Sequence, residues 1–221
     1  MVILLFGPPG CGKGTQASSI SRLLGIPAIS TGEMFRAERA AGTALGNKVS
    51  EILAQGGLVG DEIVNEVVAS RLSNLDCRGG FLLDGYPRTI PQAQYLEGLL
   101  NKLGCPAPTI LHLDVPDAAL VSRLTSRRQC PACGRIYNLL HQPPRQEGIC
   151  DNDGKPLVHR VDDNEEVVQM RLKAYHEQTG PLLQYYSTRD FHRIDGDRPL
   201  QQVFQNIEAI LDPSRAAGSR K

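Results

Sequence analysis

The residues best suited to do chemistry lie near the start of the chain, where residues 7–15 read GPPGCGKGT directly after the apolar run 2–6. The four glycines of this segment let backbone N–H groups converge on an anion, and a helix that opens near Lys13 adds the positive end of its dipole. The spacing fits the pattern G-x-x-x-x-G-K, except that Gly14 follows the lysine and the hydroxyl comes one place later, at Thr15. We therefore expect a phosphate-binding loop between a strand and a helix, with Lys13 reaching the β and γ phosphates of a nucleotide.

A second chemical cluster lies in two short cysteine-containing knuckles, CPACG at 130–134 and CDNDG at 150–154. Each knuckle presents two ligands, so the pair predicts a closed tetrahedral site, which is typical of structural zinc because no position stays open for substrate. A segment this poor in large apolar residues needs a metal to hold its shape. The predicted ligands are Cys130, Cys133, Cys150 and Asp153. The alternatives for the fourth ligand are Asp151, His141 and His159, and the alternative for the whole cluster is a group of thiols without a metal.

Six arginines fall near the predicted strand ends and insertion borders, and they are Arg36, Arg88, Arg123, Arg127, Arg160 and Arg171. Phosphoryl transfer depends mainly on positioning and on neutralising charge, so arginines beside a phosphate loop favour this chemistry over a merely solvated surface. Arg123 and Arg127 are four residues apart, and we expect them to share one helix face. Asp84 ends a predicted strand, where its carboxylate can orient Mg²⁺-bound water while Arg88 takes a phosphate, although a turn cap is the alternative role for Asp84.

Composition and charge narrow the class of protein. The chain has 221 residues with 24 basic and 24 acidic side chains, and 41% of its residues are hydrophobic. It can therefore bury a sizeable core and has no general attraction to nucleic acid or membranes. The apolar start is far shorter than the ~20 residues that span a bilayer and lacks the features of a cleaved leader. Because the other cysteines are scattered singly, no secreted disulfide framework is indicated, and we expect a cytoplasmic enzyme.

The hydrophobic pattern alternates short apolar strands with longer amphipathic helices, which predicts a parallel sheet covered on both faces. The expected strands are 2–6, 27–30, 80–84, 109–115 and 191–195. The expected helices include 14–24, 61–75, 90–103 and 116–128, the last with Pro116 at its first position. Residues 31 to about 60 are helical without a strand, and residues 129 to about 160 are rich in Cys, Gly, Pro and Asp. Both stretches read as insertions over the carboxyl edge of the sheet, where ligands bind in open α/β folds.

Four segments together resemble the adenylate kinase family of the long-lid type over nearly the whole chain. They are GPPGCGKGT at 7–15, STGEMFR at 30–36, DGYPRT at 84–89, and RVDD at 160–163 followed by Arg171. The displaced threonine of the first segment is the family's version of the loop. The cysteine knuckles resemble the lid of Gram-positive and related bacterial members, a subset of which carry Asp as the fourth ligand.

The resemblance implies a role for each matching residue. The implied ATP-binding residues are Gly10, Cys11, Gly12, Lys13, Gly14, Thr15, Arg123, Arg127, Ile136, Tyr137 and Arg198. The implied AMP-binding residues are Thr31, Arg36, Gly57, Leu58, Val59, Gly85, Tyr86, Pro87, Arg88, Gln92, Arg160 and Arg171. The implied catalytic residues are Lys13, Arg88, Arg127, Arg160 and Arg171. Asp162 and Asp163, with Glu165, are also plausible caps of the following helix.

The resemblance also implies a fold and a division of the chain. A five-stranded parallel P-loop kinase core, with helices on both faces, is expected over residues 1–29, 60–126 and 164–212. A helical AMP-binding insertion is expected over 30–59, a small zinc-knuckle β lid over 127–163, and a disordered tail over 213–221. Three positions depart from the family's usual residues, namely Gly57 for Lys, Gly60 for Pro and Tyr86 for Phe. Gly60 leaves φ free where Pro would fix it, which predicts a looser hinge.

The implied activity is reversible, Mg²⁺-dependent phosphoryl transfer from ATP to AMP, giving two ADP, by a cytoplasmic monomer whose structural Zn²⁺ lies in the lid. Two alternatives remain open. A kinase for UMP or CMP, or one that uses GTP, shares the phosphate loop, but the long metal-bearing lid and the pair Thr31 and Gln92 favour AMP. A nucleotide-dependent regulatory protein would use its knuckles on nucleic acid, but such knuckles carry basic and aromatic residues between their ligands, whereas these carry Pro131, Ala132, Asp151 and Asn152.

Overall fold

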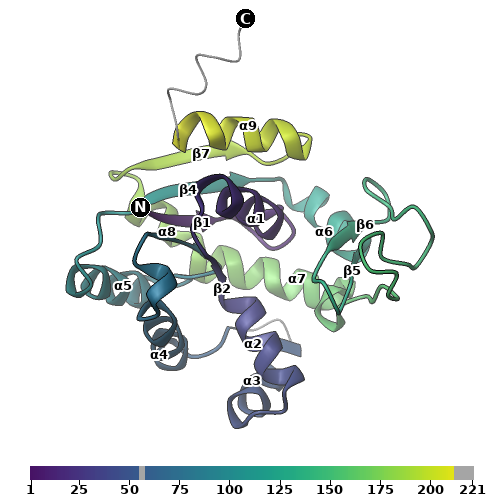
Figure 1. Cartoon of the computed structure of the whole chain (residues 1–221), viewed down its shortest axis with the longest axis horizontal. Coiled ribbons are helices and arrows are strands. Elements are labelled where there is room, and N and C mark those ends of the chain that lie inside the picture. Colours follow the sequence, from purple (N-terminus) through teal and green to yellow (C-terminus); the bar gives the residue numbers. More distant parts are fainter. Residues whose placement is uncertain (55–57, 212–221) are drawn as a thin grey trace, which may run out of the picture.

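The centre of the fold is a five-stranded sheet. The computed structural model describes residues 1–54 and 58–211. The strands are β1 (Val2–Phe6), β2 (Ala28–Ser30), β3 (Phe81–Asp84), β4 (Thr109–Asp114) and β7 (Phe191–Asp195). They lie in the order β2-β3-β1-β4-β7, and every neighbouring pair is parallel (Figure 1). The five predicted strands and the parallel sheet are thus confirmed. Because the chain runs to one side of β1 first and then to the other, a ligand crevice is expected at the carboxyl end of β1.

Helices cover both faces of this sheet, as predicted. One face packs against α4 (Asp61–Leu72), α5 (Ile90–Lys102) and α8 (Pro181–Tyr186). The other packs against α1 (Lys13–Leu24), α6 (Asp117–Thr125), α7 (Glu165–Ala174) and α9 (Leu200–Leu211). The predicted helix 116–128 was too long, because α6 ends at Thr125. Pro116 is the N-cap of α6 and not its first residue.

Two helices without an intervening strand, α2 (Thr31–Ala40) and α3 (Ala44–Ala54), form the first insertion, at the bottom of Figure 1. The Ser30 side chain caps α2 by accepting a hydrogen bond from the Glu33 N–H, at 3.4 Å. A Cβ built on Gly46 would lie 2.2 Å from the Glu38 carbonyl oxygen, so only glycine permits this approach of the two helices. Gly57 and the expected tail 213–221 lie outside the described residues.

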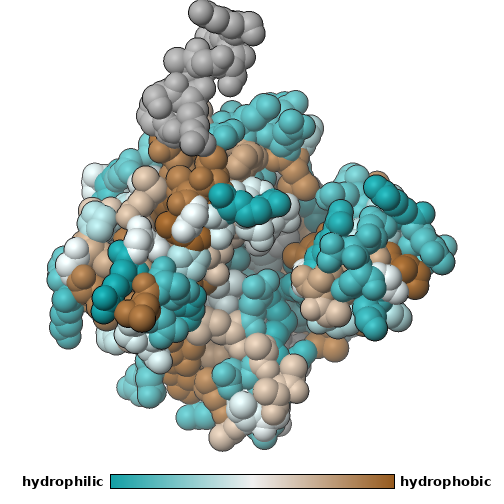
Figure 2. Space-filling view, in the orientation of Figure 1, coloured by the Kyte–Doolittle hydropathy of each residue, from teal (hydrophilic) through white to brown (hydrophobic). Residues whose placement is uncertain are grey.

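The second insertion contains a small antiparallel pair, β5 (Arg127–Gln129) and β6 (Ile136–Asn138). This pairing is why helix α6 ends at Thr125, because residues from Arg127 onward form ladder bonds with β6. The unit projects from the body between α6 and α7, carries mostly hydrophilic side chains on the visible face, and is set off by a recess (Figures 1 and 2). We refer to residues 127–163 as the lid.

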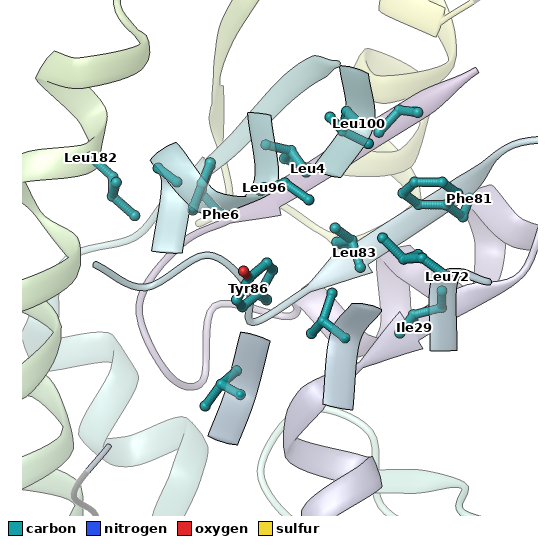
Figure 3. Close-up of a cluster of buried hydrophobic side chains, with 14 of the residues drawn as sticks. Leu4, Phe6, Ile29, Leu72, Phe81, Leu83, Tyr86, Leu96, Leu100 and Leu182 are labelled. Carbon is teal, nitrogen blue, oxygen red and sulfur yellow. The ribbon is translucent and has the colours of Figure 1, made fainter. Parts of the chain in front are cut away.

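Strand β1 explains why two separate cores form. Its side chains alternate, so that Leu4 and Phe6 point into the cluster beneath α5 and α8, while Ile3 and Leu5 point into the cluster beneath α1 and α9. Figure 3 shows the first cluster, with Tyr86 at its edge nearest the carboxyl ends of the strands. Burial on both faces fixes the register of β1, and with it the position of the loop that follows.

Within residues 1–54 and 58–211, three short helical turns complete the set of elements: η1 (Leu75–Cys77), η2 (Val161–Asp163) and η3 (Tyr175–Thr179). The last is a π-helical turn between α7 and α8, closed by the Gly180 N–H donating to the Tyr175 carbonyl at 2.8 Å. A Cβ on Gly180 would lie 2.6 Å from the His176 carbonyl oxygen, so the turn requires glycine there. Such turns are frequent at functional sites. Among the described residues, no helix combines the length and the apolar character that a membrane crossing requires.

Strand β4 carries a buried histidine inside the sheet. His112 on β4 is 3% exposed, and its Nε2 lies 3.1 Å from the Tyr175 hydroxyl oxygen. Its Nδ1 has no hydrogen-bond partner within the described part of the chain. Burial lowers the pKa of His112 to about 4, so the folded protein holds this imidazole neutral.

As the pH falls from 7 to 5, we expect the linkage to His112 protonation to lower the free energy of unfolding by about 2 kcal/mol. Its folded pKa lies below its ordinary value of 6.5, so the contribution to stability is complete above that value and is lost as the pH falls toward 4. Urea unfolding at both pH values checks this. The variant His112→Gln keeps a polar group near Tyr175 but cannot titrate, so it should lose less stability. An equal loss in both proteins would contradict the assignment.

Candidate functional site

A single cleft of about 920 Å³ opens where the carboxyl ends of the strands, the first insertion and the lid meet. The recess beside the lid in Figure 2 marks its place between body and lid. The loop after β1, the turn after β3, both lid strands and the loop before α9 contribute to its wall. A volume of this size suits ligands that are larger than one small metabolite.

The phosphate-binding loop forms the floor of this cleft. Gly10 and Gly12 have φ angles of +85° and +96°, in the left-handed region that favours glycine. A Cβ on Gly10 would also lie 2.8 Å from Leu124 Cγ, so two independent constraints require glycine there. Gly12 is the N-cap of α1, whose first residue is Lys13, and the amino end of that helix therefore faces the cleft.

Lys13 closes the loop by bonding back to its backbone. Its Nζ donates to the carbonyl oxygens of Gly7 and Pro8, at 2.6 and 2.8 Å. These are neutral acceptors, so the ammonium keeps its charge available for an incoming phosphate. The predicted loop residues all line the cleft, and they are Gly10, Cys11, Gly12, Lys13, Gly14 and Thr15.

A buried carboxylate holds two of the arginines. Asp163 is fully buried and accepts hydrogen bonds from Arg127 Nε at 2.7 Å and from Arg171 at 3.1 Å. Arg171 also pairs with Asp162 at 3.0 Å. The sequence suggested a helix cap for Asp162 and Asp163, and that suggestion was wrong. The cap is Asn164, which accepts the Val167 N–H at 2.9 Å. The RVDD motif at 160–163 identified the acidic pair, but only the three-dimensional structure shows that Asp163 lies between Arg127 and Arg171.

Arg123 and Arg127 both line the cleft, although they do not share a helix face. Arg123 lies in α6, whereas Arg127 begins strand β5. Arg123 donates to the Gly196 carbonyl at 3.1 Å and to Asp197 at 2.7 Å, which fixes it against the loop before α9. Arg198 in that loop pairs with Asp195 at 2.8 Å. The other predicted residues on this side, Ile136 and Tyr137, line the cleft as well.

Three further cations in the cleft have no carboxylate partner among the described residues, namely Arg36, Arg88 and Arg160. Arg88 donates to the Gly85 carbonyl at 2.8 Å and Arg160 to the Gln129 side-chain oxygen at 2.6 Å, both of which are neutral. Burial, reinforced by neighbouring arginines, lowers the pKa of Arg88 to about 10 and that of Arg160 to about 9. Burial also lowers the pKa of Arg36. Half-buried positive charge without a direct carboxylate partner fits an anionic ligand.

The backbone of Arg88 is held from both sides. Its N–H donates to the side-chain oxygen of Gln92 at 2.7 Å, and its carbonyl accepts from the Thr179 hydroxyl at 3.0 Å. Sequence reasoning missed Thr179, because the π-helical turn that carries it to the cleft has no pattern in the sequence. Gln92 in turn donates to Asp61 at 2.7 Å.

The remaining predicted AMP-site residues fall into two groups. Arg36, Leu58, Gly85, Pro87, Arg88, Arg160 and Arg171 line the cleft. Thr31, Val59, Tyr86 and Gln92 are buried and do not line the cleft. Thr31 donates to the Gly85 carbonyl at 2.9 Å, and Tyr86 donates to the Asn65 side chain at 2.5 Å.

Asp84 ends β3 and lines the cleft, with a residue exposure of 9%. Its carboxylate accepts no hydrogen bond from another described residue. A carboxylate that faces a phosphate site in this way suits a hydrated divalent cation.

The donor set in the lid fits a tetrahedral metal. Single ligand atoms of Cys130, Cys133, Cys150 and Asp153 all lie within 4.8 Å of one another. Cys133 Sγ is 3.5 Å from Cys150 Sγ, and Cys130 Sγ is 3.3 Å from an Asp153 oxygen. A zinc tetrahedron with Zn–S bonds near 2.3 Å has edges of about 3.8 Å, close to these separations.

The two knuckles have the same backbone structure. The Gly134 N–H donates to the Cys130 carbonyl at 3.0 Å, and the Gly154 N–H donates to the Cys150 carbonyl at 2.9 Å. Both glycines have positive φ, +74° and +68°. The repeat places Asp153 where Cys133 stands in the first knuckle, so the structure assembles the predicted set and not one with Asp151, His141 or His159.

Comparison with known proteins gives a consistent result. A family model described as adenylate kinase matches residues 5–191. A protein named adenylate kinase from Oceanobacillus iheyensis is 49% identical over 213 residues, 96% of this chain and 99% of the relative. Proteins of the same name from Pseudothermotoga lettingae and Symbiobacterium thermophilum are 48% and 46% identical, and cover 96% and 97% of this chain and 98% and 100% of their own lengths.

We expect Asp163→Asn to lower the free energy of unfolding by about 3 kcal/mol or more, because it leaves Arg127 and Arg171 without their shared buried carboxylate. The matched control is Asp197→Asn. Asp197 pairs with Arg123 at 2.7 Å, but its side chain is 46% exposed, so its loss should cost about 1 kcal/mol or less. Urea unfolding of both variants measures the difference, and equal effects would refute the role of burial.

Proposed function

The chain belongs to the adenylate kinase family, and on that premise we propose that it catalyses the reversible transfer of a phosphoryl group from MgATP to AMP, giving two ADP. The observation that carries the proposal is the group of cations in one cleft. Arg36, Arg88 and Arg160 have only neutral partners or none among the described residues, and they face the loop that holds Lys13. Two nucleotides whose phosphates meet in this space supply the missing negative charge.

ATP binds on the side of the cleft formed by the phosphate loop, α6, the lid strands and the loop before α9. The loop amides and Lys13 bind the β and γ phosphates, because the amino end of α1 and a mobile ammonium converge there. Arg127 neutralises the same phosphates from the lid. The base lies by Arg123 and the backbone near Arg198, with Ile136 and Tyr137 on its lid side.

AMP binds on the opposite side, under the first insertion. Arg36 and Arg88 take its α-phosphate, and Leu58, Gly85 and Pro87 complete the wall. Thr31, Val59, Tyr86 and Gln92 lie just behind that wall and remain predictions as residues that select the base. For Gln92 to reach a base, its hydrogen bonds with Asp61 and Arg88 must be exchanged, which couples base recognition to the position of Arg88.

The transfer itself needs positioning more than acid–base chemistry. An oxygen of the AMP phosphate attacks the γ-phosphorus of ATP in line, and the bond from that phosphorus to the β-bridging oxygen breaks as ADP leaves. The attacking oxygen is already ionised at neutral pH, so no general base is required. Arg88, Arg127, Arg160 and Arg171 with Lys13 neutralise the charge that spreads over the transferred oxygens.

Mg²⁺ would supply further neutralisation of the phosphates when bound, and Asp84 would be the residue that holds it, through water. The lid closes over both substrates and excludes water, which would otherwise accept the phosphoryl group. In this scheme the core comprises 1–29, 60–126 and 164–212, the AMP-binding unit 30–59 and the lid 127–163. We further propose that the protein acts as a cytoplasmic monomer.

Zn²⁺ is the metal we propose for the lid, held by Cys130, Cys133, Cys150 and Asp153. All four positions are taken by protein ligands, so the site is structural and leaves no place for substrate.

The test of the function is ADP formation from MgATP with AMP, UMP, CMP and GMP offered separately. A strong preference for AMP is expected. The control is Lys13→Ala, which should lose about 3 kcal/mol or more of transition-state stabilisation. A preference for another monophosphate would keep the reaction but overturn the roles of Thr31 and Gln92. No transfer to any acceptor would contradict the proposal and favour the nucleic-acid-binding alternative, which a retardation assay at physiological salt tests directly.

Removal of the lid metal should lower the melting temperature, because a metal that binds only the folded chain adds its binding free energy to stability. Turnover at saturating nucleotide and low temperature should persist, since the metal contacts no reacting atom. Calorimetry and initial rates before and after chelation measure both effects. Immediate loss of turnover while the circular dichroism spectrum is preserved would contradict a structural role.

A further inference from the structure

Tyr137 occupies the space between the lid knuckles and the cleft. It lies in the middle of β6, is 2% exposed, and packs with Cys130 and Cys150 in a small lid core that Leu157 flanks. It is the large aromatic side chain of that core. The same residue lines the nucleotide cleft. It therefore belongs to two sites at once.

Its hydroxyl group contacts the second knuckle twice. The hydroxyl donates a hydrogen bond to Cys150 Sγ at 3.4 Å, and its oxygen accepts the backbone N–H of Asp151 at 2.7 Å. A thiolate that binds a metal gains from such donors, which orient the ligand and set its basicity. The Asn152 N–H supplies a second donor to the same sulfur at 3.4 Å. Tyr137 is thus the side-chain donor that holds Cys150 in place.

The other end of Tyr137 is fixed to the cleft wall. In the β5–β6 ladder, the backbone of Tyr137 pairs with Arg128. The next residue, Asn138, pairs with Arg127. The Asn138 side chain donates to the Arg123 carbonyl at 3.1 Å. The ring has the Arg135 guanidinium 5.3 Å from its centroid, which restrains its tilt. Tyr137 thus connects Cys150 to the strand that forms the cleft wall beside Arg127.

We propose that Tyr137 is a positioning residue that couples metal binding in the lid to nucleotide binding in the cleft. The proposal rests on the function proposed above, in which the lid holds Zn²⁺ and the cleft holds ATP. If an occupied metal site raises the affinity for ATP by some factor, ATP raises the affinity for the metal by the same factor. The hydroxyl bond to Cys150 is the link, since it joins a metal ligand to a residue of the cleft.

The test uses Tyr137→Phe, which keeps the ring and removes only the hydroxyl. The matched control is Tyr186→Phe, because Tyr186 is equally buried but its hydroxyl has no partner among the described residues. Competition with a chromophoric chelator should show Zn²⁺ affinity about 10- to 100-fold weaker in Tyr137→Phe and unchanged in Tyr186→Phe. With Co²⁺ in place of Zn²⁺, the thiolate-to-metal absorption band should shift in the first variant alone.

The coupling itself is measured by titrating MgATP into metal-loaded and metal-stripped protein. In the wild type, loading should lower the ATP dissociation constant several-fold, and this ratio should fall toward one in Tyr137→Phe. Unchanged Zn²⁺ affinity and an unchanged Co²⁺ spectrum in that variant would overturn the proposal, as would equal ATP affinity of loaded and stripped wild type. AMP phosphorylation by the wild type is assayed separately, so failure of this coupling is distinguished from failure of the proposed function.

Discussion

Half-buried positive charge that has no direct carboxylate partner in the cleft is the constraint on which the rest of this structure depends. A guanidinium removed from water is costly unless something compensates it, and Arg88 and Arg160 receive only neutral acceptors from the folded chain. The depressed pKa values of both groups express that cost. The fold tolerates it because two covered sheet faces supply stability elsewhere. In the function proposed above, the phosphates of the two nucleotides supply the compensating negative charge.

The surrounding structure serves to hold these charges at fixed positions. Asp163 ties Arg127 of the lid and Arg171 of α7 together at the junction of lid and core, so the two cations are held near one another. Thr179 and Gln92 fix the backbone of Arg88 from opposite sides. Residues outside this group of arginines thus decide where their guanidinium groups lie. Under the proposed function, a distortion of the π-helical turn or of the lid junction is expected to change the chemistry from a distance.

The sequence predicted most of the fold, because its strongest signals are local. Short apolar runs between amphipathic stretches predicted the five strands, glycine spacing predicted the phosphate loop, and the repeated knuckles predicted the four lid ligands that the structure brings together. The failures share one cause, which is that partners far apart in sequence override a local pattern. Helical spacing placed Arg127 on a helix, but pairing with β6 makes it a strand. Capping rules suggested Asp163 as a helix cap, but its carboxylate instead pairs with Arg127, 36 residues away in sequence, and with Arg171. No pattern marked Thr179.

The most direct test of this account is the free energy of unfolding of ligand-free Arg88→Met, compared with wild type by urea denaturation. The Gly85 carbonyl keeps a donor in the variant, because Thr31 also donates to it, so the change removes the charge without leaving an unpaired acceptor. The account predicts that stability rises by about 1 kcal/mol or more while phosphoryl transfer falls about 100-fold or more. A variant less stable than wild type would contradict the account, since Arg88 would then stabilise the ligand-free protein instead of destabilising it.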